Sequence, residues 1–218
     1  MVVLSERERE VLRRAGVGVR YPKGQIIFSA GEYADRVYLI EDGAVKIYRL
    51  DPQGREITVG GIRNPGEIMG LAETLYRATR TCSARAIAPV KLVVLTKAEF
   101  LGILAAEYHL ALKVASVLGA RLRATEGLVY ALMCRQVSAR LAQLLLKIGE
   151  HYGVRTARGV KIKLPLTYGE IASMIGSSRQ TVTSLMSAFR EDGSIAMEGK
   201  GIIIRDAEKL AGWAMKEA

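Results

Sequence analysis

Two hydrophobic periods follow one another along the chain. Between about residues 17 and 96, apolar residues come in short runs separated by glycine-containing turns, for example at residues 42–43 and 64–66. Runs of this length and spacing are typical of a small barrel or roll of antiparallel strands. The predicted strands lie at residues 25–28, 36–40, 44–50, 56–62 and 90–95.

A helical period begins near residue 97. Residues 97–104 predict a short helix, and residues 107–133 lack proline and predict a long one. A seam of apolar positions runs along the long helix, with spacings that alternate between four and three residues. Such a heptad seam can pack on the roll, but self-pairing across a two-fold axis is favoured because so long a helix must bury a second face. The seam consists of Ala111, Ala115, Leu118, Leu122, Thr125, Val129 and Leu132.

The C-terminal third predicts a helix at residues 137–152, a strand at residues 161–164, and then two helices joined by a tight turn at residues 166–191. Thr167 and Glu170 have the spacing of a capping box at the start of the first of these two helices. Gly176 supplies the turn, and Ser177 or Ser178 caps the second helix. This pattern predicts a helix-turn-helix.

Polar side chains lie on the outer face of the second helix, since Val182, Leu185, Met186 and Phe189 take the inner face. Arginine can pair with guanine, and glutamine with adenine, in the major groove. The serine and threonine hydroxyls suit phosphates. The predicted hairpin at residues 194–205 would be a wing with Lys200 near the DNA backbone. A helical hairpin with a solvated face is the alternative. The outward residues are Ser178, Arg179, Gln180, Thr183 and Ser184.

Charge and composition agree with a nucleic-acid partner. The net charge is +10, and residues 135–218 hold 13 Lys and Arg against 8 Asp and Glu. Cys82 and Cys134 form no disulfide framework, and we see neither an apolar signal segment nor a membrane span. We therefore expect a reduced, cytoplasmic protein that is not membrane-bound. The sequence has no Ser/His/Asp grouping, metal-ligand cluster or Walker-type loop, which argues against an enzyme and against a bound metal.

These features resemble the Crp/Fnr superfamily of bacterial regulators, typified by the cyclic-AMP receptor protein. The resemblance rests on PKGQIIFSAGEYADRVYLIEDGAVKIY at residues 22–48, on the long helix, and on IGSSRQTVTSLMSAFREDGSI at residues 175–195. It implies an α+β fold in three parts. These are a cyclic-nucleotide-binding-type sensor β-roll at residues 1–106, a dimerisation helix at residues 107–134 and a winged helix-turn-helix at residues 135–218.

The resemblance implies a homodimeric transcription regulator, such as an activator, that binds a palindromic double-stranded DNA site and has RNA polymerase as a partner. Arg179 matches the arginine with which the family reads guanine. Gln180 and Ser184 stand where the cyclic-AMP receptor protein has glutamate and arginine, so the target sequence should differ. The expected DNA contacts are Thr167, Ser178, Arg179, Gln180, Thr181, Thr183, Ser184 and Lys200.

The resemblance also implies control by a small effector at the interface of the roll and the long helix. Arg80-Thr81 matches the pair that holds the phosphate of cyclic AMP or cyclic GMP. Gly70 is followed by Leu71 where the family has glutamate, so Glu73 is the nearest carboxylate. Thr125 matches a threonine that contacts the base. The expected effector residues are Gly70, Glu73, Arg80, Thr81 and Thr125.

Other signals stay open. A regulator of the same fold could respond to a redox signal, a haem-bound gas or another small molecule, or could be constitutively active. No cysteine precedes Cys82, which argues against an iron–sulfur centre, and His109 and His151 lie outside the roll, which argues against haem. The more remote alternative is a nucleotide-binding module that acts on a protein partner, because a basic, DNA-binding type of region follows the roll at residues 135–218.

Overall fold

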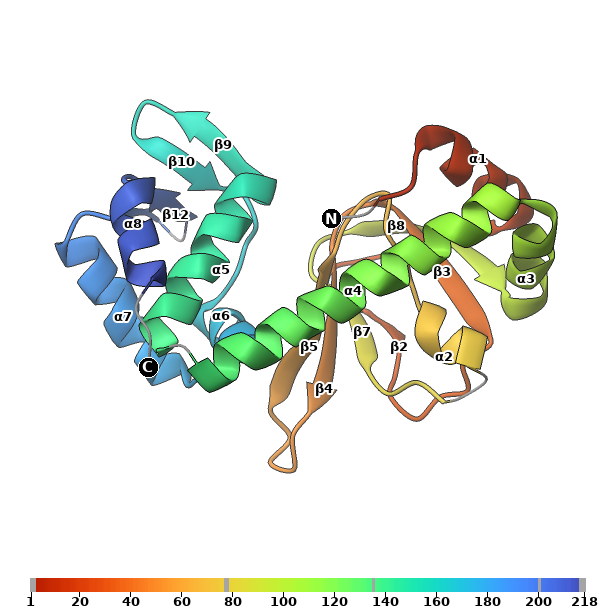
Figure 1. The fold of residues 1–218 in the computed structure, drawn as a ribbon, viewed down its shortest axis with the longest axis horizontal. Helices are drawn as coiled ribbons and strands as arrows, with labels where there is room; N and C mark the ends of the chain where they lie inside the picture. The colour runs from red at the N-terminus through yellow and green to blue at the C-terminus, as the bar shows by residue number, and fades with distance from the viewer. Residues whose placement is uncertain (1–2, 77–78, 135, 200, 216–218) are drawn as a thin grey trace. The chain divides into compact units, whose positions relative to one another are not determined.

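The computed structural model describes residues 3–76, 79–134, 136–199 and 201–215. It divides into two compact units, residues 1–124 and 125–218. The long helix α4 (Tyr108–Cys134), green in Figure 1, begins in the first unit and ends in the second. The fold is the predicted α+β arrangement of a β-roll, a long helix and a C-terminal winged helix-turn-helix.

The roll of the first unit consists of two four-stranded sheets with antiparallel pairing. One has the strand order β1-β8-β3-β6, and the other has the order β2-β7-β4-β5. The strands are β1 (Val17–Tyr21), β2 (Ile26–Phe28), β3 (Arg36–Asp42), β4 (Val45–Leu50), β5 (Glu56–Arg63), β6 (Ile68–Met69), β7 (Ser83–Ala86) and β8 (Val90–Thr96).

Strand β3 shows why the apolar runs of the roll are nearly continuous. Successive side chains of a strand point to opposite faces. Tyr38 and Ile40 enter the core between the two sheets, whereas Val37 and Leu39 enter a second core that Phe100, Leu110 and other helical residues complete. Both faces of this strand are therefore buried.

Four helices belong to the first unit: α1 (Glu6–Ala15), α2 (Leu71–Tyr76), α3 (Lys97–Ala106) and the first part of α4. Leu110, Val114 and Val117 of α4 are buried against the roll's second core. Among the described residues no single helix is both long enough and apolar enough to cross a membrane. Helices α3 and α4 meet those criteria only as a pair, with a bend of 115° between them.

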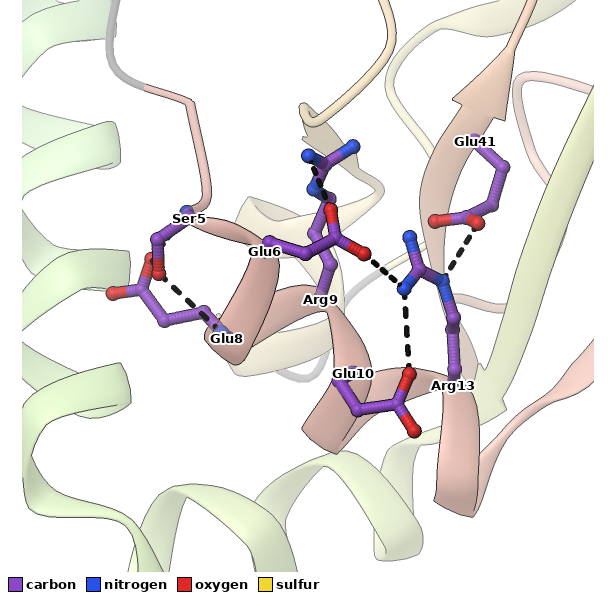
Figure 2. A network of polar contacts seen from close by, with 7 residues as sticks. All are labelled: Ser5, Glu6, Glu8, Arg9, Glu10, Arg13 and Glu41. Carbon is purple, nitrogen blue, oxygen red and sulfur yellow. Dashed lines mark hydrogen bonds and ion pairs between the residues drawn. The ribbon is translucent and has the colours of Figure 1, made fainter.

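The sequence analysis did not predict helix α1. Arg13 forms ion pairs within this helix and one with Glu41 of the roll (Figure 2). The guanidinium of Arg13 lies 2.5 Å from Glu6, 3.3 Å from Glu10 and 2.7 Å from Glu41 of β3. Ser5 and Glu8 form a capping box at the first turn of the helix. These contacts stabilise α1, which buries only Leu12 completely.

The second unit surrounds α5 (Val137–Tyr152), whose buried face includes Leu141, Leu145 and Ile148. A four-stranded sheet of order β11-β12-β10-β9 packs with it. The other elements are β9 (Gly153–Thr156), β10 (Gly159–Ile162), α6 (Tyr168–Ile175), α7 (Arg179–Glu191), β11 (Ile195–Glu198), β12 (Gly201–Ile204) and α8 (Ala207–Ala214).

Several elements differ from the prediction. The strand expected at residues 161–164 is β10, which starts earlier and ends at Ile162, because it pairs with β9 to form a hairpin that the sequence analysis missed. Helix α8 was also missed. The β9–β10 hairpin and helix α8 are both short, and each is stable only through packing on the rest of the unit.

The heptad seam of α4 borders the stripe that packs on the roll, and Leu118 of the seam packs against the roll's second core. Ala111 and Leu118 are partly buried, but Leu122 is 60% exposed and Val129 is 50% exposed in the single chain. Leu128, Tyr130 and Met133 enlarge this exposed apolar surface. Helix α4 thus leaves a second apolar face uncovered, as self-pairing requires.

Candidate nucleic-acid interface and effector cassette

The helix-turn-helix begins at the predicted capping box. Thr167 Oγ1 accepts a hydrogen bond from the Glu170 backbone N–H, and the Glu170 carboxylate accepts one from the Thr167 N–H at 2.6 Å. Gly176 ends α6 in the left-handed region with φ +62°, which glycine adopts without the penalty of a Cβ. Ser178, rather than Ser177, then caps α7 by accepting from the Thr181 N–H at 3.0 Å.

Helix α7 buries one face and exposes the other. Val182, Met186 and Phe189 are at most 1% exposed. Arg179 and Gln180 are exposed in the first turn. An amphipathic helix held in this way presents its N-terminal polar groups on a rigid support, which is the geometry of a recognition helix in the major groove.

The hydroxyl groups of the predicted contact set that lie on α7 or at its cap have partners within the chain. Thr183 Oγ1 donates to the Arg179 carbonyl at 2.8 Å, and Ser184 Oγ donates to the Gln180 carbonyl at 3.3 Å. Thr181 Oγ1 lies 2.8 Å from Ser178 Oγ. Thr183 and Ser184 are exposed, and a hydroxyl bonded to its own helix retains lone pairs for a further donor. Their predicted roles at phosphates and bases stay predictions.

Arg140 of α5 fixes the turn of the motif. Its Nε donates to the Ile175 carbonyl at 3.0 Å, so it satisfies a carbonyl at the end of α6. A Cβ added to Gly176 would lie 3.0 Å from Leu132 of α4. The sequence analysis missed Arg140, because the helices that it joins are far apart in the sequence.

The predicted wing is the hairpin of β11 and β12. Ion pairs join Glu198 near its tip to Lys161 and Arg158 of the neighbouring hairpin, the second at 3.7 Å. The wing is part of a four-stranded sheet, because β12 also pairs with β10. The predicted backbone contact Lys200 lies outside the described residues.

We call the expected effector residues of the roll, Gly70, Glu73, Arg80 and Thr81, the effector cassette. Arg80 is buried inside the roll. Its terminal nitrogens donate to the carbonyls of Gly70, at 2.9 Å, and of Arg36, and lie 3.4 Å from Thr74 Oγ1. The guanidinium also packs over Phe28, 4.5 Å from the ring centre. Arg80 is 3% exposed, and both of its terminal nitrogens donate to protein carbonyls.

The other cassette residues are similarly engaged. The Glu73 carboxylate accepts from the Thr81 hydroxyl at 2.7 Å. Leu71, at the family's glutamate position, is 1% exposed and packs in the second core of the roll. Gly70 has φ +78°, and a Cβ on it would lie 2.8 Å from the Arg80 guanidinium. Four of the five predicted residues thus come together: Gly70, Glu73, Arg80 and Thr81.

Thr125 belongs to the second unit, where it is exposed on α4. Arg121, four residues earlier on α4, was missed by the sequence analysis. It donates to the Ile68 carbonyl of β6 and lies 3.9 Å from Glu67. Burial, together with the positive charge of Arg63, lowers the pKa of Arg121 to about 10. Arg121 thereby ties α4 to the strand that leads into the cassette.

A cyclic nucleotide needs cationic and backbone donors for its phosphate and a carboxylate for its ribose hydroxyl. The cassette contains Arg80 and Thr81, but Arg80 binds protein carbonyls, and Leu71 replaces the carboxylate. Glu73 is occupied by Thr81. As arranged, Arg80 and Glu73 are engaged by protein groups.

The geometry defines a class: a sensor-type roll joined by a long helix to a winged helix-turn-helix with an exposed recognition helix. Residues 18–107 match the family Cyclic nucleotide-binding domain, and residues 139–213 match the Crp-like helix-turn-helix domain. The first match lies in the first unit of the chain and the second match lies in the second unit.

Similar proteins give the family. The chain is 33% identical over 195 residues to a CRP-like cAMP-activated global transcriptional regulator of Mycobacterium tuberculosis, covering 88% of this chain and 86% of that one. It is 34% identical over 187 residues to the Global nitrogen regulator of Synechococcus elongatus, covering 85% and 84%. FixK2 of Bradyrhizobium japonicum shares the fold, with a TM-score of 0.81 at 23% identity and coverage of 93% and 99%. The chain belongs to the Crp/Fnr superfamily of DNA-binding transcription regulators, which carry an effector-binding domain.

Proposed function

We propose that the protein binds a palindromic DNA site as a homodimer, with Arg179 of each subunit reading a guanine. The observation that carries this proposal is that the first turn of α7 is exposed while the opposite face of the helix is buried in the core of the second unit. The exposed seam of α4 would pair the subunits and give the two readers a two-fold relation. Gln180 and Ser184 would read neighbouring bases, whereas Thr167, Ser178, Thr181, Thr183 and Lys200 would contact the backbone.

The proposal assigns one role to each part of the chain. Residues 1–106 bind the effector, residues 107–134 pair the two subunits, and residues 135–218 bind DNA. Arg121 supports a route between sensing and pairing, because it joins α4 to the strand before Gly70. The protein would act in the cytoplasm, where its DNA lies, with RNA polymerase as its partner in activation.

Selection of DNA from a random pool tests the reader. We expect a palindrome with a guanine in each half-site, bound tightly with a strong dependence on salt. Arg179→Ala should weaken binding by about 1–3 kcal/mol per half-site contact and relax the preference for that guanine.

Arg190→Ala is the matched control, because Arg190 is exposed at the other end of α7. Its removal takes away the same charge, about 16 Å along the helix axis, without taking away the base contact. Equal affinity of the wild type for selected and random DNA at moderate salt contradicts the proposal.

For the effector, we propose a signal other than cyclic AMP or cyclic GMP. The family match and the relative named as cAMP-activated favour a cyclic nucleotide. Leu71 and the committed donors of Arg80 argue more directly against one. Calorimetric titration with each nucleotide should show no saturable heat. Saturable heat from the wild type with either nucleotide would establish the cyclic-nucleotide alternative instead.

A further inference from the structure

Helix α8 packs beside α5 in the second unit (Figure 1). Leu210 and Ala214 of α8 are buried in the core of this unit. Helix α8 follows the wing strand β12, and Asp206, just before the helix, caps it by accepting from the Lys209 N–H at 2.9 Å. None of the expected DNA-contacting residues lies on this helix. Its polar side chains nevertheless reach the end of the recognition helix.

Trp213 of α8 contacts the C-terminal end of α7 in two ways. Its indole ring packs on Phe189 of α7, with ring centres 5.1 Å apart and planes inclined by 55°. Its Nε1 donates to Oδ2 of Asp192, the residue after α7, at 2.5 Å. Phe189 is completely buried, so Trp213 joins a core contact to a polar contact at the helix end.

Asp192 in turn joins α7 to the wing. Its Oδ1 accepts from the Ser194 N–H at 2.8 Å, and its backbone carbonyl accepts from Lys209 Nζ at 3.1 Å. The Ser194 carbonyl accepts from the Arg205 and Asp206 N–H groups just after the wing. The turn at residues 192–194 is therefore held from both sides.

The carboxylate of Asp192 is held in its charged form. Burial alone would raise the pKa of this group, but hydrogen bonds from Ser194 and Trp213 and the charge of Lys209 outweigh burial and lower it. A charged acceptor makes the hydrogen bond from the indole stronger than a neutral one would.

We infer that α8 is a clamp that fixes the angle between the recognition helix and the wing, with Trp213 and Lys209 acting through Asp192. The inference rests on the proposed DNA-binding function. Arg179 lies about 20 Å along α7 from Asp192, so a tilt of about 10° at the clamp displaces the reading end by about 3 Å. Base contacts need tighter positioning than that. Trp213, Lys209 and Asp192 are thus positioning residues for DNA recognition.

Binding of full-length variants to the selected palindrome tests the clamp. Trp213→Phe keeps a ring but removes the N–H donor, and Asp192→Asn removes the charge. We expect each to weaken specific binding about tenfold, as the loss of one charge-assisted hydrogen bond predicts. Lys209→Ala should have a smaller effect. Lys147→Ala, which removes a charge from an exposed position on α5, is the control and should change nothing.

Two readouts separate positioning from general destabilisation. The slope of log affinity against log salt should stay at the wild-type value, because no phosphate contact is removed. Phosphate-ethylation interference should show the same phosphate contacts as the wild type, whereas the preference for the guanine read by Arg179 should weaken. Trp213 is the only tryptophan, so its emission reports the docking of α8 in Asp192→Asn and Lys209→Ala.

Wild-type affinity in both Trp213→Phe and Asp192→Asn would overturn the clamp. So would weaker binding that the unfolded fraction of each variant, measured by urea titration, explains completely. A wild type that selects no sequence overturns the proposed function and the clamp with it, and this outcome is visible before any variant is compared.

Discussion

Arg80 and Arg179 are the two arginines that match family motifs, and the structure treats them in opposite ways. Arg80 lies inside the roll, where its terminal nitrogens donate to the carbonyls of Gly70 and Arg36. Arg179 is exposed in the first turn of α7. The cassette is closed on itself, whereas the reader is open to a partner.

The difference shows that a motif match identifies a position but not its use. A buried guanidinium must be satisfied wherever it lies, and protein carbonyls can satisfy it as well as a phosphate can. An exposed guanidinium is satisfied by water, which DNA can displace. We therefore infer a structural role for Arg80 and a binding role for Arg179, although both fit their motifs.

The largest expected effects appear when both stability and DNA binding are measured for substitutions of these two arginines. Arg80→Ala should lower the free energy of unfolding by about 3 kcal/mol, because buried acceptors lose their donor. Arg179→Ala should leave that free energy within about 0.5 kcal/mol of the wild type while weakening specific DNA binding. Urea denaturation and DNA titration of the same preparations measure both. Losses in both assays for Arg179→Ala would contradict the comparison.

Leu71→Glu sharpens the comparison within the cassette by restoring the family's carboxylate. Leu71 packs in the roll's second core, so a carboxylate there should cost about 3 kcal/mol of stability without creating a nucleotide site. Leu71→Met keeps the volume and should cost less than about 1.5 kcal/mol. A stable Leu71→Glu protein that binds cyclic AMP would show that the cassette needs only this residue.

Gly176→Ala tests the turn that orients the reader. Its φ of +62° and the contact of an added Cβ with Leu132 at 3.0 Å predict a loss of about 1–2 kcal/mol of stability. Gly169→Ala, within α6, has no positive φ, and its added Cβ would make only an ordinary van der Waals contact with Thr167 at 3.8 Å, so it should be neutral or stabilising. Equal unfolding midpoints for the two variants would mean that the turn is not constrained.

The smallest expected effect concerns acid stability of the roll. Burial alone would raise the pKa of Glu56, but hydrogen bonds and charges from Lys46 and Arg85 outweigh it and hold the pKa below its ordinary 4.5. The resulting stabilisation is present above pH 4.5 and is lost as the pH falls through the lower folded value.

Glu56→Gln should therefore flatten the pH dependence of unfolding below pH 4.5. Glu150→Gln, at an exposed position on α5, should leave the dependence as it is in the wild type. If Glu56→Gln leaves the pH dependence of unfolding unchanged, the lowered pKa of Glu56 is not its cause.

Much of the reader could be predicted from the sequence because its signals are local. The capping box at Thr167, the glycine turn at Gly176 and the inward face of α7 were all confirmed. Each depends on residues within a few positions of one another. Helix α8 was missed because its reason for folding lies elsewhere: Trp213 meets Asp192 and Phe189, which are distant in the chain.

The sequence alone determined the periods of the strands and helices, the exposed seam of α4 and the order of roll, long helix and reader. Only the tertiary structure decided what the functional groups contact. It brought Arg80 to a carbonyl 44 positions away and buried Leu71. The physical reason is the range of the forces: periodicity and capping act within one element, whereas the partner of a buried polar group depends on how distant elements pack.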